Sequence, residues 1–214
     1  MSEEPQITVS EEKNRDLRSF FLNNKKSFII FASILLIALF TYCFYSDYKK
    51  NLKFEISEKY NSALISYEKE NPSQSVLEMK SIINSKDSTY SPLALYFLLD
   101  NNLLKSKNEI NQYFNIIINE INLDTEIKNL IIYKKGLYNS NSATEEELLN
   151  ILNPLINSES IWKSHSLYLM AEYFFSKNEK QKSKEFFEKI LEMEDSNPQI
   201  KIQAQKRLRR DLGA

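Results

Sequence analysis

"SHSLYLMAEYFFSKNEKQKSKEFFEKILEMED", residues 164–195, contains two amphipathic helices of similar length on either side of a polar turn at Asn178. Apolar side chains recur every three or four residues on both sides of that turn, which is the helical period. Because one pair of such helices leaves part of its apolar surface uncovered, it has to stack on a neighbouring pair. The stretch therefore predicts a series of helix pairs rather than an isolated one.

The preceding and following residues repeat this plan at a regular spacing. Four helices are expected to begin after polar turns, at intervals of 34, 36 and 36 residues: at Ser91-Pro92, at Thr125, at Ile161-Trp162 and at Asn197-Pro198. Each interval has room for two helices, with turns expected at Leu104 to Asn108 and at Gly136 to Thr144, where Thr144 and Glu147 form a capping box. This period predicts a helical-hairpin solenoid.

Composition agrees with an all-α fold. The 214 residues include only two Gly and five Pro, and 12% of them are aromatic, which favours helix and excludes a disordered chain. The formal net charge of −1 gives no reason to expect binding to nucleic acid.

A second stretch, "KKSFIIFASILLIALFTYCFYSDYKK" at residues 25–50, predicts a membrane anchor. Its eighteen residues from Phe28 to Tyr45 carry no charge, and as a helix they extend about 27 Å, close to the hydrocarbon thickness of a bilayer. A core helix and a cleaved signal peptide are the alternatives, but no small residues mark a cleavage site. Cys43 lacks the preceding small residue of an acylated cysteine, so we expect a lipid-facing thiol.

Four segments are expected: a cytoplasmic tail with an amphipathic turn (1–26), a transmembrane helix (27–46), a linker helix with the first helical hairpin (47–90), and repeats with a C-terminal capping helix (91–214). The anchor helix should continue towards Glu70 and end at Asn71-Pro72, before a helix over 73–85. Near the membrane, five Lys/Arg precede the span and four follow it, which slightly favours a cytoplasmic N-terminus.

The unit at residues 161–191 resembles the tetratricopeptide repeat (TPR). The residues at the repeat's characteristic positions are Met170, Ala171, Phe174, Asn178 at the turn, Ser183, Phe187 and a bulkier Ile190 at the last small position. Small residues are needed there because two helices approach closely only where one side chain is short.

Taken whole, the chain resembles the YfgM-like family of bacterial membrane-anchored TPR proteins. The similar stretches are "DLRSFFLNNKKSFIIF", "STYSPLALYFLLDNNLLKSK", "IWKSHSLYLMAEYFFSKNEKQKSKEFFEKIL" and "PQIKIQAQKRLRRDL". The resemblance implies a single-pass protein of the bacterial inner membrane with a periplasmic domain. It also implies an ancillary role at the Sec translocon, with periplasmic chaperones or exported chains as partners. An excess of Lys, Asn and Ile, with little Ala and Gly, departs from typical members and fits an AT-rich genome.

No residue pattern predicts an enzyme, a cofactor or a small-molecule substrate. His165 is the only histidine, so neither a catalytic triad nor a catalytic zinc site can be built around it, and we expect a helix-face or partly buried side chain. Gly136 and Gly213 are isolated, which excludes a glycine-rich phosphate loop.

Aromatic residues are abundant in the predicted repeats, and most should form the contacts between helices. Adjacent aromatic residues cannot both point inward, so some should reach a groove that binds an extended or helical peptide. Trp162 and Tyr168 are the expected partner contacts. The alternative to a protein-binding module is an envelope or division scaffold that oligomerises through its helices.

Overall fold

The computed structural model describes residues 25–69 and 71–213. Within these ranges, only the backbone is described for Ser27 and Phe28. Within this part of the chain every regular element is a helix and no strand occurs, which confirms the all-α prediction. The predicted tail at residues 1–26, with its amphipathic turn, falls almost wholly outside the described residues.

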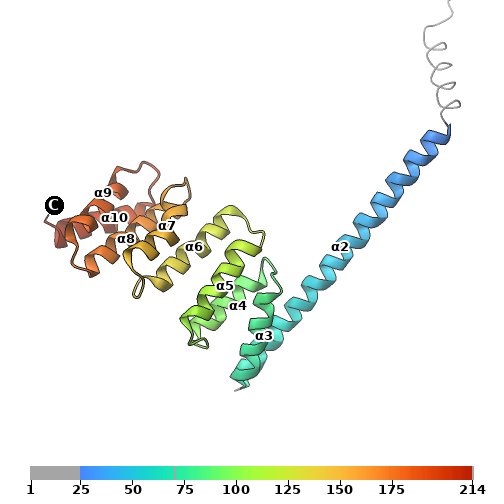
Figure 1. The fold of residues 1–214 in the computed structure, drawn as a ribbon, viewed down its shortest axis with the longest axis horizontal. Coiled ribbons are helices and arrows are strands. Elements are labelled where there is room, and N and C mark those ends of the chain that lie inside the picture. The colour runs from blue at the N-terminus through green and yellow to red at the C-terminus, as the bar shows by residue number, and fades with distance from the viewer. Residues whose placement is uncertain (1–24, 70, 214) are drawn as a thin grey trace, which may run out of the picture. The chain divides into compact units, whose positions relative to one another are not determined.

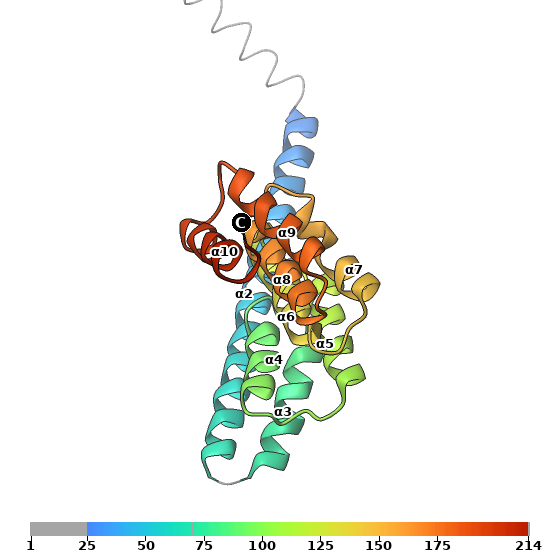
Figure 2. The same cartoon turned by 90° about the vertical axis from the view of Figure 1, so that its left-hand side faces the viewer.

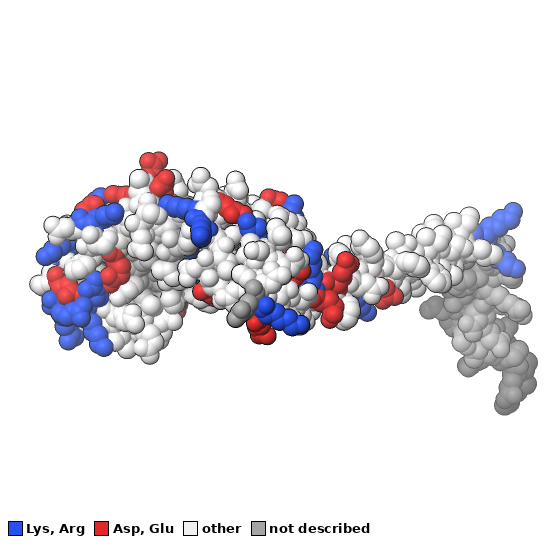
Figure 3. Space-filling view, turned by 90° about the horizontal axis from the view of Figure 1, so that it is seen from below, with Lys and Arg blue, Asp and Glu red and all other residues white. Residues whose placement is uncertain are grey.

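The first described helix, α2 (Lys25–Glu68), is 44 residues long. It contains a window that is long and apolar enough to cross a membrane, and none of that window is buried in the structure. Figure 3 shows this part of α2 with almost no charged side chains. One N-terminal apolar helix of spanning length is therefore present, as predicted. It continues past the apolar window and ends two residues short of the expected Glu70.

The described chain divides into two units between Glu55 and Ile56, so α2 contributes to both. After α2, the described part of the second unit contains eight helices (Figure 1): α3 (Pro72–Asn84), α4 (Tyr90–Asp100), α5 (Lys107–Glu120), α6 (Thr125–Asn139), α7 (Glu145–Ile156), α8 (Lys163–Ser176), α9 (Lys180–Glu192) and α10 (Pro198–Asp211).

Each helix from α3 to α9 packs against the helix that follows it, as both Figure 1 and Figure 2 show. Further contacts join α3 to α5, α6 to α8, and α8 to α10. The buried apolar side chains form three clusters that follow one another along the chain. The first combines the end of α2 with α3, α4, α5 and Ile131; the second lies among α6, α7 and α8; the third lies among α8, α9 and α10. The core is thus built from neighbouring helices rather than around one centre.

Short-range signals define the helix ends. The capping box of Thr144 and Glu147 is present at the start of α7, as predicted. Asn178 has φ 63° and ends α8 in the left-handed conformation, which confirms the expected turn. Asn102 ends α4 in the same way with φ 53°, so that turn begins before the expected Leu104.

Gly136 has a different role from the one expected. The sequence places it in a turn from Gly136 to Thr144, but α6 continues to Asn139. A Cβ atom added at Gly136 would lie 2.5 Å from Leu152 Cδ2, because the side chain of this fully buried leucine of α7 packs directly on the glycine. Gly136 therefore allows α6 and α7 to approach closely.

Candidate protein-binding groove

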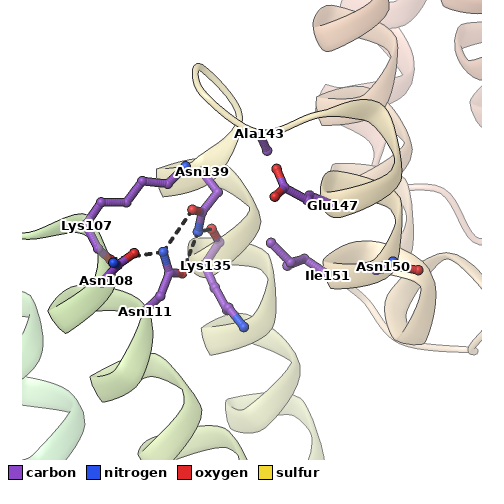
Figure 4. A pocket seen from close by; sticks show the side chains of 9 residues that line it. All are labelled: Lys107, Asn108, Asn111, Lys135, Asn139, Ala143, Glu147, Asn150 and Ile151. Atoms are coloured by element: carbon purple, nitrogen blue, oxygen red, sulfur yellow. Dashed lines mark hydrogen bonds between the residues drawn. The ribbon is translucent and has the colours of Figure 1, made fainter.

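A groove lined by amide, charged and apolar side chains lies between α5 and α7, alongside α6. It consists of two neighbouring cavities of about 400 and 290 Å³. Lys135, Asn150 and Ile151 line both cavities, so the two are continuous. Figure 4 shows the larger one, with side chains from α5 and α6 on one side and from α7 on the other.

One wall of the groove is a row of asparagines on α5. The residues at positions 108, 111, 115 and 119 recur at intervals of three and four, so they share one face of the helix. Asn139 and Asn150 add two more amides from α6 and α7. Each asparagine amide offers two N–H donors and one carbonyl acceptor. No aromatic residue lines either cavity.

Asn111 and Asn139 form a reciprocal pair that joins α5 to α6. Asn111 Nδ2 donates to Asn139 Oδ1 at 3.1 Å, and Asn139 Nδ2 donates to Asn111 Oδ1 at 2.9 Å. Each also donates to a backbone carbonyl of its own helix, that of Lys107 or of Lys135. Both amides are thereby occupied, and Asn139 is buried. This pair supports the groove wall rather than offering free groups to a ligand.

Lys135 lies where the two cavities meet. Its Nζ donates to Asn115 Oδ1 at 2.7 Å, and the side chain is half-buried. Burial lowers the pKa of the Lys135 ammonium. Among the described residues, the ion pairs do not include Lys135. The groove therefore contains a partly desolvated ammonium that has a neutral hydrogen-bond partner.

The opposite wall belongs to α7, which contains a proline. Pro154 lies inside α7 and lines the smaller cavity together with Asn150. Because proline has no N–H, the carbonyl oxygen of Asn150 receives no helical hydrogen bond from residue 154. Glu147 is the one carboxylate among the lining residues, and it accepts a hydrogen bond from the Thr144 backbone N–H at 2.9 Å.

The two walls of the groove pack on different neighbours. α5 packs on α4 and α6, whereas α7 packs on α6 and α8. The α5 face that borders the groove carries mainly amides, whereas the α7 face combines one amide with a carboxylate, an isoleucine and a proline. Beneath them, Ile132 and Leu152 are buried in the second cluster. Buried apolar side chains thus lie beneath the groove.

Trp162 does not line this groove. It directly precedes α8, is half-buried, and stacks on Tyr133 of α6 with ring centroids 5.6 Å apart and planes at 21°. His165 lies against both rings at 5.1 and 5.8 Å. The three rings fasten the start of α8 to α6, and a partner contact by Trp162 stays a prediction.

Tyr168 lies elsewhere, at the contact between α8 and α9. Its ring meets Phe187 edge-on with centroids 5.3 Å apart, and the side chain is half-buried. Burial raises the pKa of Tyr168 to about 12, and the nearby carboxylate of Glu172 adds to the effect. The structure does not bring Trp162 and Tyr168 into the groove, and the partner-binding role of Tyr168 also stays a prediction.

Asn139→Ala is expected to lower the free energy of unfolding by about 1–2 kcal/mol, because it leaves Asn111 without its buried partner. Urea unfolding of the full chain in detergent, followed by circular dichroism, measures this loss. Asn150→Ala is the matched control: its exposed side chain should be worth less than about 0.5 kcal/mol. Equal losses for the two variants would contradict a structural role for the Asn111–Asn139 pair.

His165 is expected to make stability depend on pH. Burial lowers its pKa below the usual 6.5, and the Ile161 carbonyl only partly opposes this. Above pH 6.5, the usual pKa, both the folded and the unfolded chain carry a mostly neutral imidazole. As the pH falls through 6.5, the imidazole of the unfolded chain binds a proton while that of the folded chain is still neutral. The free energy of unfolding therefore decreases. Melting temperatures of the wild type and of His165→Gln between about pH 7.5 and pH 5.5 test this. The wild type should lose more stability, and equal slopes would contradict the prediction.

Within residues 25–69 and 71–213, no group of three or more His, Cys, Asp or Glu side chains gathers in a way that could hold a metal ion. In comparisons with family models, with curated proteins and with solved structures, no match to the chain was found.

Proposed function

We propose that this chain is a membrane-tethered protein-interaction module. Its second unit acts as a TPR-like solenoid of helix pairs, and the groove between α5 and α7 is the binding site for other proteins. The protein catalyses no reaction. The observation that carries the proposal is the groove itself, which extends along about 18 Å of α5 and presents six amides and the partly buried ammonium of Lys135.

The packing supports the solenoid. Every helix from α3 to α9 contacts the next, and the contacts of α6 with α8 and of α8 with α10 join alternate helices. Helix pairs that stack in a row produce this pattern. The small or special residues expected of a repeat agree with it: Ala171 and Ser183 are fully buried, and Asn178 adopts the left-handed turn.

The apolar part of α2 supports the tether. A covalent link to a bilayer confines the groove near the membrane, which raises its effective concentration towards membrane-bound or emerging chains without any added contact. We place the N-terminus in the cytoplasm and the helical domain in the periplasm of a bacterial cell. As the resemblance to YfgM-like proteins implies, the partners would be the Sec translocon, periplasmic chaperones or exported chains.

Site-specific crosslinking in cells tests the proposal. A photoreactive amino acid at Asn119 or Asn150, both exposed in the groove, should form adducts with other proteins. The same amino acid at Gln181 of α9 or Gln205 of α10, which are exposed but outside the groove, serves as the control. Adducts with translocon subunits, chaperones or exported chains would support the proposed location. Equal adduct yields at all four positions would refute the groove as a binding site.

The competing scaffold hypothesis predicts a different result for the purified full chain in detergent. A scaffold should form an oligomer that persists on dilution when its mass is measured by light scattering. A binding module should be monomeric, or should associate only weakly. Reporter fusions at both termini would test the orientation separately, and a cytoplasmic domain would exclude the periplasmic partners.

A further inference from the structure

The groove has the length and direction to hold an extended polypeptide segment. Its α5 wall runs from Lys107 to Asn119, twelve helical steps or about 18 Å. An extended chain advances about 3.3 Å per residue, so about five residues fill that length. The amides of Asn108 and Asn119 form none of the hydrogen bonds recorded among the described residues, and Asn115 uses only its carbonyl oxygen, as acceptor for Lys135. An extended backbone, which alternates N–H and C=O groups, matches such amides.

The α7 wall adds an amide that faces those of α5 across the groove. The Asn150 side chain is exposed in both cavities and can both donate and accept. These groups recognise a main chain and are indifferent to its side chains.

Lys135 is the residue of the groove that can select a particular side chain of the bound segment. A half-buried ammonium whose only hydrogen bond among the described residues is to a neutral amide is stabilised by an incoming carboxylate. The Glu147 carboxylate, which also borders the larger cavity, already accepts from the backbone of Thr144. Lys107 lies at one end of the groove and is exposed, so solvent weakens its attraction for an anion.

We infer that the groove binds an extended segment of another protein with an Asp or Glu side chain at its middle residue, which pairs with Lys135 while the asparagines bind the main chain. The carboxylate comes from a side chain and not from a chain end, because Lys135 lines both cavities and a terminus there would leave one cavity empty. The inference rests on the proposed function and adds the class of segment recognised.

Peptide binding to the full chain in nanodiscs tests the inference by fluorescence anisotropy. The probes are two libraries of labelled, acetylated and amidated heptapeptides with mixed uncharged residues around a central Glu or a central Gln. The Glu library should bind about tenfold more tightly, as expected for one charge-assisted hydrogen bond. Lys135→Gln should make the two affinities equal. Lys134→Gln removes the same charge from the adjacent, exposed residue of α6, and should preserve the preference.

The contacts between the groove asparagines and the main chain of the bound segment can be tested separately. Asn119→Ala combined with Asn150→Ala should weaken both libraries by the same factor, because these amides do not contact the central side chain. A third library, with neutral residues and a free C-terminal carboxylate, should bind more weakly than the Glu library. Tighter binding of that library would overturn the internal position of the acidic residue.

The inference is overturned if neither library binds, if both bind equally, or if Lys135→Gln and Lys134→Gln behave alike. Equal binding of the two libraries together with groove-specific crosslinks in cells would refute the inference and leave the proposed function intact. Selective peptide binding without any crosslinks from Asn119 or Asn150 would refute the proposed function in the cell. The inference about the recognised segment would then stand by itself.

Discussion

Replacing Leu36 and Ile37 together by arginine is expected to release the protein from the membrane. Both side chains are more than half exposed in the structure and lie near the middle of the uncharged stretch. An arginine at the centre of a spanning helix costs about 3 kcal/mol of insertion free energy, so two cost about 6 kcal/mol in addition to the apolar side chains lost. The measurement is the share of full-length protein that stays in the membrane pellet after alkaline carbonate extraction.

Phe54→Arg is the matched control for this experiment. Phe54 is 67% exposed on the same helix but lies eight residues beyond the expected end of the span at residue 46. That variant should stay in the pellet. Intact-mass measurement of the wild type adds an independent check, because a cleaved signal peptide would shorten the chain at or after the apolar stretch. Retention of the double variant in the pellet would contradict the anchor.

Helix boundaries could be predicted where they depend on neighbouring residues alone. The capping box of Thr144 and Glu147 satisfies two backbone N–H groups within four residues of sequence, so its pattern identifies the start of α7 directly. Asn178 is similar, since a left-handed residue that ends a helix is specified by local backbone geometry. These interactions are unaffected by the rest of the fold.

Gly136 shows where such local reasoning fails. Glycine is typical of turns and unfavourable inside helices, so the sequence favours a turn there. The structure continues α6 through it because Leu152, from the next helix, occupies the space of the missing side chain. The deciding contact joins residues sixteen positions apart, and neither residue type reveals it.

The groove was missed for a related reason. The excess of asparagine fits an AT-rich genome, yet positions 108, 111, 115 and 119 fall on one face of a single helix, a period that indicates a row of amides. What the sequence could not show is that Lys135 and Asn150, from two other helices, meet that face. Only the packing of α5 and α7 on α6 brings the six amides and the two lysine ammonium groups around one groove.

The sequence also predicts that two adjacent aromatic residues divide between the core and the surface. Phe174 and Phe175 follow it: Phe174 is 1% exposed, whereas Phe175 is half-buried with the Arg207 guanidinium 4.3 Å above its ring. The expectation is wrong for the pairs 113–114 and 173–174, in which both aromatic side chains are buried. Successive helical residues point only about 100° apart, so a helix with neighbours on two sides can bury both. Phe174 packs edge-on against Tyr173 and tilted against Phe186, with centroids 5.6 and 5.4 Å away. The two residues are chemically identical and adjacent, so their environments alone distinguish them.

Phe174→Ala is therefore expected to lower the free energy of unfolding by about 3–5 kcal/mol, from lost burial and the cavity left among α7, α8 and α9. That loss is a large fraction of the 5–15 kcal/mol typical of a folded domain. Phe175→Ala loses partial burial and one cation–π contact, so it should cost about 1 kcal/mol. Urea unfolding of both variants in detergent compares them. Equal losses would mean that α8 does not present Phe174 to the core, and the packing of α8 between α7 and α9, on which the buried side chains beneath the groove depend, would then be wrong.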